Sequence, residues 1–221
     1  MKIEQIEILI QNLPQAPGIY GRDEFLNSVV LALLIPVGDE YHFVFQKRHN
    51  SIRQGGEICF PGGCCDPVID GSLEQTAIRE TTEEMGIPEE KIRIIGRLDT
   101  LVMPMRAIVD AFVGVADVPF EAIKPNQKEV ESIFATPISF FESHKPEIFE
   151  IKTVMQSRFI DEQGREVVLF PAREMNLPEK YHTQWESGRY KVYVYRLPEG
   201  ILWGLTARIV RDIVNKLTPV H

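Results

Sequence analysis

The chain has 221 residues, of which 44% are apolar and 25% are charged, a length and composition typical of one globular domain that folds unaided. Its net charge of −8 argues against a nucleic-acid partner, because the phosphate backbone would be repelled. No apolar run approaches the roughly 18 residues of a membrane span, and residues 1–5 lack the basic start of a signal peptide. We therefore expect neither nucleic acid nor membrane among its partners.

The cysteines indicate a reducing compartment. They are three in number, Cys59, Cys64 and Cys65, and the adjacent pair cannot easily form a bridge. Free thiols are the simplest account, so a cytoplasmic location is expected. The absence of a C-x2-C pair disfavours a zinc site.

The first third of the chain predicts one helix and two strands. Apolar residues at 3, 6, 9, 10 and 13 recur at helical spacing, and two prolines, at 14 and 17, end that helix. Residues 28–35 form a continuous apolar run, which indicates a buried strand. Residues 41–45 predict a second strand, joined to the first by a hairpin turn at Gly38-Asp39.

The rest of the chain alternates between strands and helices. Ser72 is a suitable N-cap for a helix whose apolar face includes Ala77 and Met85. Trp203 and the tyrosines of the last third are expected in the core or, alternatively, stacked on an adenine ring. Strands are expected at 92–98, 108–115 and 190–195, a short mixed segment at 134–141, a hairpin around 161–164 within residues 149–170, and a closing helix at 205–217. The pattern predicts an α+β fold with a mixed β-sheet between helices, in a single domain over residues 1–221 with an N-terminal helix and a C-terminal helical extension.

Three carboxylates share one face of the acidic helix. Glu80, Glu83 and Glu84 have the spacing i, i+3, i+4, at which like charges repel each other. A bound cation would relieve that repulsion, and oxygen-only ligands suit a hard ion such as Mg²⁺ or Mn²⁺. The alternative is an ordinary solvated acidic face.

A basic stretch lies upstream of these glutamates. Lys47, Arg48, His49 and Arg53 follow one another without an acid until Glu57. The stretch is either a solvated loop or a clamp for phosphate groups, to which arginine gives forked contacts.

The glycine-rich turn and the acidic helix together resemble the Nudix box, G-x5-E-x7-R-E-U-x-E-E-x-G-U, where U is a bulky apolar residue. The residues that match are Gly63, Arg79-Glu80, Glu83-Glu84, Gly86 and Ile87. Thr81 replaces the first U, and Gly63 to Arg79 is 16 steps where the motif has 14. Gly71 falls where the first glutamate would be, so Asp70 or Glu74 is expected to substitute.

A second resemblance is to the coenzyme A pyrophosphatase group, whose signature is L-L-T-x-R-(S/A)-x3-R-x3-G-x3-F-P-G-G. Residues 44–63 follow it, with Arg48, Arg53 and Phe60-Pro61-Gly62-Gly63 in place. Gln46 and His49 depart from it, and one residue is missing between the second arginine and its glycine.

These resemblances imply a Nudix fold and a site. The metal ligands would be Glu80, Glu83 and Glu84 with the carbonyl of Gly63, and Arg79 would orient the glutamates. One of those glutamates, or Glu129 or Glu131 downstream, would activate the attacking water. Substrate contacts would come from Arg48, Arg53, Gly62 and Gly63.

The implied activity is hydrolysis of the pyrophosphate of coenzyme A or acyl-CoA, a small-molecule nucleotide derivative, to 3′,5′-ADP and (acyl-)4′-phosphopantetheine. One alternative is a Nudix pyrophosphatase that acts on ADP-ribose, NADH, a dinucleoside polyphosphate or an oxidised nucleotide. Another is a non-catalytic module that senses a nucleotide. A homodimer is an open expectation.

Overall fold

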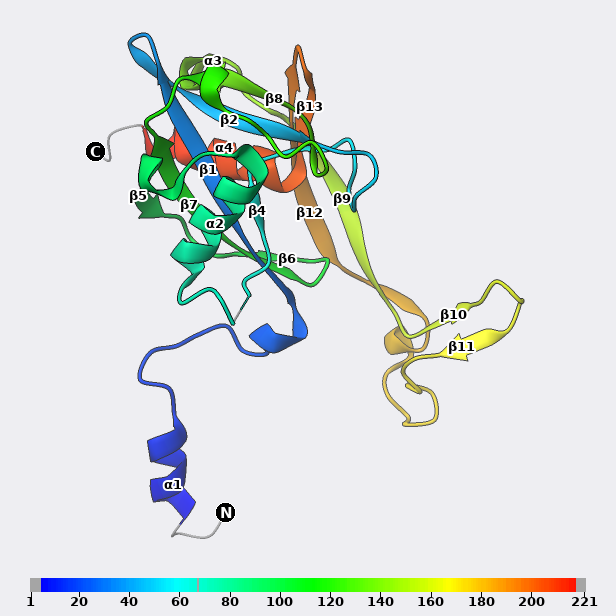
Figure 1. The fold of residues 1–221 in the computed structure, drawn as a ribbon. Helices are drawn as coiled ribbons and strands as arrows, with labels where there is room; N and C mark the ends of the chain where they lie inside the picture. Colours follow the sequence, from blue (N-terminus) through cyan, green and yellow to red (C-terminus); the bar gives the residue numbers. More distant parts are fainter. Residues whose placement is uncertain (1–4, 67, 218–221) are drawn as a thin grey trace.

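The computed structural model describes residues 5–66 and 68–217. Its main sheet consists of β1 (Leu26–Val37), β2 (Glu40–Arg48), β3 (Ile58–Cys59), β4 (Gly62–Gly63), β5 (Ile92–Arg97), β6 (Leu101–Met103), β7 (Ala107–Ala116) and β8 (Val130–Pro137). The strand order is β3-β2-β1-β7-β5, with β4 beside β1, β6 beside β7 and β8 beside β2. Two helices, α2 (Leu73–Met85) and α4 (Gly204–Lys216), cover opposite faces of this sheet (Figure 1).

The central strand β1 explains these layers. Leu31 and Leu33 pack on the α2 side with Met85, whereas Ala32 and Leu34 pack on the α4 side. A strand buried on both faces is apolar throughout, which is why it appears in the sequence as a continuous run. It pairs antiparallel with β2 and parallel with β7. The predicted α+β fold with a mixed sheet between helices is therefore confirmed.

Most of the predicted elements lie close to their expected bounds. The turn at Gly38-Asp39 joins β1 to β2, with Val37 opposite Glu40. The mixed segment at 134–141 comprises the end of β8 and the short helix α3 (Ile138–Ser143). The described residues also form short 3-10 helices: η1 (Arg22–Glu24), η2 (Glu89–Lys91), η3 (Phe120–Ala122) and η4 (Glu179–Tyr181).

A second sheet has three strands, β13 (Gly200–Trp203), β12 (Gln184–Leu197) and β9 (Glu147–Gln156), in that order. Its inner face packs on the α4 side of the core through Tyr193 and Tyr195. Leu202 takes the inward position on β13, so the neighbouring Trp203 is 47% exposed and the expectation that Trp203 lies in the core is wrong.

Beyond the core, β9 and β12 continue as a two-stranded arm. We use this name for the end of β9, the start of β12 and the segment 157–183 between them. Its tip carries the predicted hairpin around 161–164, formed by β10 (Arg158–Ile160) and β11 (Glu166–Val168), and the whole arm leaves the body of the protein (Figure 1). The strand expected at 190–195 is thus much longer, and the stretch 149–170, expected to hold the hairpin, also contains most of β9.

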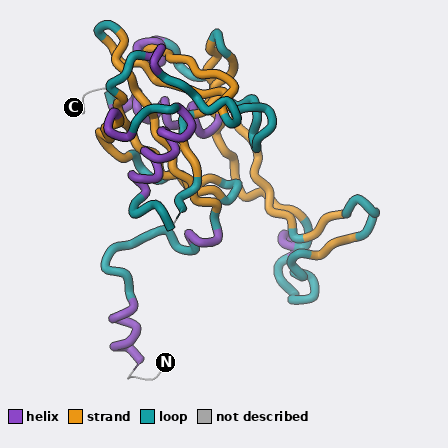
Figure 2. The backbone as a smooth tube through the Cα atoms, in the orientation of Figure 1, coloured by secondary structure: helices purple, strands orange, loops and turns teal. Residues whose placement is uncertain are grey.

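The helix α1 (Gln5–Asn12) stands apart from the sheet (Figure 2). It confirms the predicted N-terminal helix, although residues 1–4 lie outside the described part. Neither apolar cluster of the described residues includes a side chain of α1, and its Leu9 and Ile10 are exposed. A single domain that spans residues 1–221 therefore stays a prediction.

A buried ion cluster joins three segments at the start of β1. Asp110 of β7 is 0% exposed, accepts hydrogen bonds from Thr100 Oγ1 and Arg97 Nη2, each at 2.6 Å, and pairs with Arg22. Burial alone would raise the pKa of Asp110, but these donors outweigh burial and lower it.

Candidate active site

The two glycines of β4 allow the helix to approach the sheet. Gly62 and Gly63 pair with Val30 and Val29 of β1. A Cβ at Gly62 would collide with the carbonyl oxygen of Val29, and a Cβ at Gly63 would lie 2.5 Å from the carboxylate of Glu80. Gly62 therefore requires glycine, a side chain at Gly63 would displace the carboxylate of Glu80, and the turn places its backbone directly against the acidic helix.

The ends of α2 are defined by its sequence. Ser72 Oγ accepts a hydrogen bond from the N–H of Gln75, which confirms the predicted N-cap. Gly86 ends the helix at φ 66°, a conformation that glycine adopts without strain. Thr81, which stands where the Nudix box has an apolar residue, is buried because its Oγ1 donates to the carbonyl of Ala77 at 2.7 Å.

Glu84 is the most deeply buried of the three glutamates. The residue is 3% exposed, and its Oε2 accepts hydrogen bonds from the N–H of Gly62 at 2.9 Å and from Gln46 Nε2 at 2.8 Å. Burial raises the pKa of Glu84 to about 7 in spite of these donors. The other oxygen, Oε1, lies 4.0 Å from Nη1 of Arg48.

Gln46 is a site residue that the sequence analysis missed. It lies on β2 and is 0% exposed, and its Oε1 has no hydrogen-bond partner among the described residues. Its Nε2 donates to Oε2 of Glu84, while Oε1 of the same carboxylate faces Arg48. The available signal was a polar residue directly after the apolar run 43–45, where the coenzyme A signature has threonine.

Arg79 ties the extended box loop to the helix. Its Nε and Nη2 donate to the two carboxylate oxygens of Asp70, each at 2.9 Å, while Nη1 lies 2.9 Å from Glu80 and 3.1 Å from Glu83. The hydrogen bonds from Arg79 hold the pKa of Asp70 well below its usual range. Asp70, and not Glu74, thus has the position expected of the missing first glutamate.

Glu80 and Glu129 are electrostatically coupled. Burial raises the pKa of Glu80, and the negative charges of Glu83 and Glu129 raise it further. Glu131, the other downstream acid, is instead bound by Lys47 Nζ at 2.6 Å. The charge of Glu129 thus acts on Glu80 and has no basic partner among the described residues, whereas that of Glu131 is paired with Lys47.

The basic stretch folds back toward the same glutamates. Arg48 Nε donates to the carbonyl of Arg53 at 3.1 Å, and the N–H of His49 donates to the carbonyl of Glu129 at 2.8 Å. The side chain of Arg53 is exposed. The start of the loop is thus held beside residue 129, and the side chain of Arg53 has no ion-pair partner among the described residues, so it can meet an anionic ligand.

The glutamates of α2 and the carbonyl of Gly63 offer the oxygen ligands that a hard divalent cation prefers. The carboxylates do not, however, converge on one point as a complete set of ligands would. Within residues 5–66 and 68–217, no three Asp, Glu, His or Cys side chains converge on one point. Glu83 is turned toward Arg79 and is mostly exposed. Nevertheless, the carboxylate of Glu80 occupies the space left by the missing Cβ of Gly63, and Oε1 of Glu84 accepts no hydrogen bond from a described residue and lies 4.0 Å from Arg48. Carboxylate and carbonyl oxygens are the donors that such an ion prefers.

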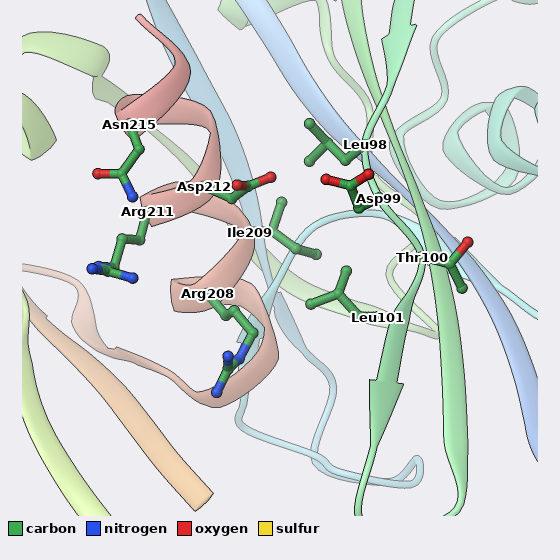
Figure 3. Close-up of a pocket in the computed structure, with 9 residues that line it drawn as sticks. All are labelled: Leu98, Asp99, Thr100, Leu101, Arg208, Ile209, Arg211, Asp212 and Asn215. Atoms are coloured by element: carbon green, nitrogen blue, oxygen red, sulfur yellow. The ribbon is translucent and has the colours of Figure 1, made fainter. Parts of the chain in front are cut away.

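A separate cavity of about 230 Å³ lies on the α4 side, between α4 and residues 98–101 (Figure 3). Its lining includes Arg208, Asp212 and Asp99, and none of the expected site residues. It therefore belongs to the opposite face of the sheet from the box.

A mixed sheet with a glycine-rich turn packed against an acidic helix is the arrangement that defines the Nudix class of proteins. A model of the NUDIX domain matches residues 27–155, more than half of the chain. The chain therefore belongs to the Nudix family. Nudix hydrolases generally use divalent metal ions.

The relatives include coenzyme A diphosphatases. A peroxisomal coenzyme A diphosphatase of Mus musculus, NUDT7, is 34% identical over 140 residues, which are 62% of this chain and 58% of that protein. A mitochondrial coenzyme A diphosphatase of Homo sapiens, NUDT8, is 36% identical over 88 residues, 39% and 37% of the two chains. An uncharacterized Nudix hydrolase of Photorhabdus laumondii, NudL, is 26% identical over 194 residues, 86% of each chain. The chain spans less than two thirds of the length of both diphosphatases.

None of the described helices has the length and apolar content that crossing a membrane requires.

Proposed function

We propose that the protein hydrolyses the pyrophosphate of coenzyme A or acyl-CoA, with Mg²⁺ or Mn²⁺, to 3′,5′-ADP and 4′-phosphopantetheine or its acyl form. The observation that supports this most is that the coenzyme A signature and the Nudix box lie next to each other in the structure. Arg48 of the upstream signature lies 4.0 Å from Glu84 of the box, so the loop that carries Arg53 borders the glutamate face. The names of two relatives point to the same substrate.

The metal would be held by Glu80, Glu83 and Glu84, with the carbonyl oxygen of Gly63 as a further ligand. When bound, a divalent ion neutralises phosphate charge and lowers the pKa of a coordinated water. The side chains and backbone of the protein would orient the ligands, neutralise the substrate and accept the proton.

Three of these tasks concern orientation and charge. Gly62 and Gln46 fix one oxygen of Glu84, and Arg79, itself fixed by Asp70, orients Glu80 and Glu83. Arg48 and Arg53 would neutralise the phosphates of the substrate, including the 3′-phosphate of coenzyme A.

The proton of the attacking water would pass to a carboxylate, and Glu129 is the candidate because its charge stands beside Glu80 without a basic partner among the described residues. Water adds to one phosphorus, and the bond from that phosphorus to the bridging oxygen breaks. A cysteine nucleophile is disfavoured at Cys59, because burial raises the pKa of its thiol to about 11.

A second candidate is a Nudix pyrophosphatase of different specificity. It is supported by Gln46 and His49, which replace the signature residues, and by the shortened spacing after Arg53. A non-catalytic sensor has less support, because all three box glutamates are present.

The test is product identification by mass spectrometry after incubation with coenzyme A, acyl-CoA, ADP-ribose or NADH in Mg²⁺ or Mn²⁺. Our proposal predicts 3′,5′-ADP and 4′-phosphopantetheine as the main products. If ADP-ribose gives AMP and ribose 5-phosphate while coenzyme A is left intact, the proposed substrate is wrong and the second candidate is right.

The cytoplasmic location stays a prediction, since the two mammalian relatives are named as peroxisomal and mitochondrial.

A further inference from the structure

The outer edge of β9 is open. β9 is the terminal strand of the second sheet, and it pairs with β12 along its length. In the part of the chain that the structure describes, no strand pairs with its other side. It has ten residues and contains no proline, so it presents a long row of backbone donors and acceptors. Such an edge is a template for another strand.

The side chains of β9 also lack cover. Five apolar residues on it are each 47–54% exposed: Ile148, Phe149, Ile151, Val154 and Met155. They lie on both faces, because odd and even positions alternate along a strand. The arm leaves the body of the protein (Figure 1), and a ribbon of two strands cannot bury either of its faces alone. Apolar exposure of this extent marks an interaction surface.

The charged residues of β9 favour a second copy of the same strand as its partner, in one particular register. Two copies related by a twofold axis normal to the sheet pair antiparallel, and residues opposite each other must then be on the same face. The axis must therefore pass between the two copies of one residue. In every facing pair, both residue numbers are then odd or both are even. With the axis at Glu150 or at Lys152, two like charges meet. With the axis at Ile151, Glu150 of each copy faces Lys152 of the other.

The same register matches the apolar positions. With the axis at Ile151, Ile148 of each copy faces Val154 of the other, and Phe149 faces Thr153. Within one chain, Glu150 is paired with Arg189 and Lys152 with Glu186. The contact would join these two pairs into rows of alternating charge, which adds to their stability without breaking either.

We propose that two copies of this chain associate through β9, edge to edge about an axis at Ile151, and so form one continuous six-stranded sheet. This inference is independent of the proposed substrate, because it uses no residue of the candidate active site. It gives the expected homodimer a specific surface and a specific register.

The test is sedimentation equilibrium of the full chain, with charge reversals at the two facing positions. Wild type is expected to be a dimer at micromolar concentration. Glu150→Lys and Lys152→Glu should each weaken association about tenfold or more, because each places like charges opposite one another twice per dimer. The double variant Glu150→Lys/Lys152→Glu should restore it, since the opposite charges then face each other again.

Glu162→Lys is the matched control, because it makes the same charge change at the tip of the arm, away from the axis, and should associate as wild type does. Far-UV circular dichroism verifies that each variant is folded. A monomeric wild type would overturn the proposal. Single variants that associate normally, or a folded double variant that stays as weak as the single ones, would overturn it too.

Discussion

The box helix and the arm are both rich in charged residues, but they differ in what those charges do. In α2, Arg79 is held among Asp70, Glu80 and Glu83, and Glu84 is buried against β4. In the arm, pairs such as Lys152–Glu186 lie on the surface, where an ion pair contributes little to stability. The apolar side chains beside them are half exposed.

This difference separates chemistry from association. The box has its supporting contacts inside one chain, so the geometry of the site does not depend on a partner. The arm lacks such contacts and, on our account, acquires them from a second copy. Substitutions in α2 should therefore change turnover and leave association intact, whereas substitutions in β9 should do the opposite.

The largest expected effect is that of Glu84→Gln, which should lower turnover by at least about a hundredfold. The change removes a negative charge from the proposed metal site with almost no change in size. Steady-state kinetics with coenzyme A measure the loss, and circular dichroism verifies the fold. Glu74→Gln, an exposed position on the same helix, is the control and should keep wild-type turnover. A near-normal rate for Glu84→Gln would remove this residue from the site.

The stability of the metal-free protein should fall as pH rises through the range in which Glu84 titrates. Burial raises the pKa of this carboxyl from 4.5 to about 7, so between these values the unfolded chain has lost a proton that the folded chain retains. The free energy of unfolding should decrease by about 2 kcal/mol from pH 5 to pH 7. Asp70 and Asp110 have lowered pKa values and act in the opposite sense, but at more acid pH.

Urea unfolding with excess EDTA measures this slope. In Glu84→Gln the decrease should become much smaller, because glutamine does not titrate and only Glu80, whose pKa burial also raises, still acts in this direction. An equal slope in the variant and the wild type would mean that another group is responsible.

A smaller effect is expected at Gln46, which touches Glu84 and not the substrate. Gln46→Leu keeps the approximate size but removes the donor to Glu84 Oε2, and loss of such an orienting contact should weaken Mn²⁺ binding about tenfold. Titration of free Mn²⁺ by electron paramagnetic resonance measures it. Gln184→Leu, an exposed position where β12 begins in the arm, is the control. Unchanged Mn²⁺ affinity in Gln46→Leu would mean that Gln46 contributes to packing and does not orient Glu84 for the metal.

The parts of the fold that depend on neighbouring residues could be predicted from the sequence. The run 28–35 is apolar because it is buried on both faces, and Ser72 and Gly86 mark the ends of α2 with local hydrogen bonds and backbone angles. The motif spacing likewise predicted a shared helix face for the site residues Arg79, Glu80, Glu83 and Glu84.

The parts that depend on distant residues could not be predicted. Gln46 and Glu84 are 38 positions apart, and only the packing of β2 against α2 brings them together. The choice between Asp70 and Glu74 depends on the path of an extended loop, for which spacing gives no rule. β9 mixes charged and apolar residues because its apolar positions are exposed on both faces, so it lacks the alternation that identifies a half-buried strand.

The central claim is the bond that is broken, and hydrolysis of acyl-CoA in ¹⁸O-labelled water tests it most directly. We predict acyl-4′-phosphopantetheine with its acyl group retained, 3′,5′-ADP, and one ¹⁸O atom on the phosphate of a single product, as water attack on one phosphorus requires. Release of a free fatty acid, or label in a carboxylate, would contradict the account.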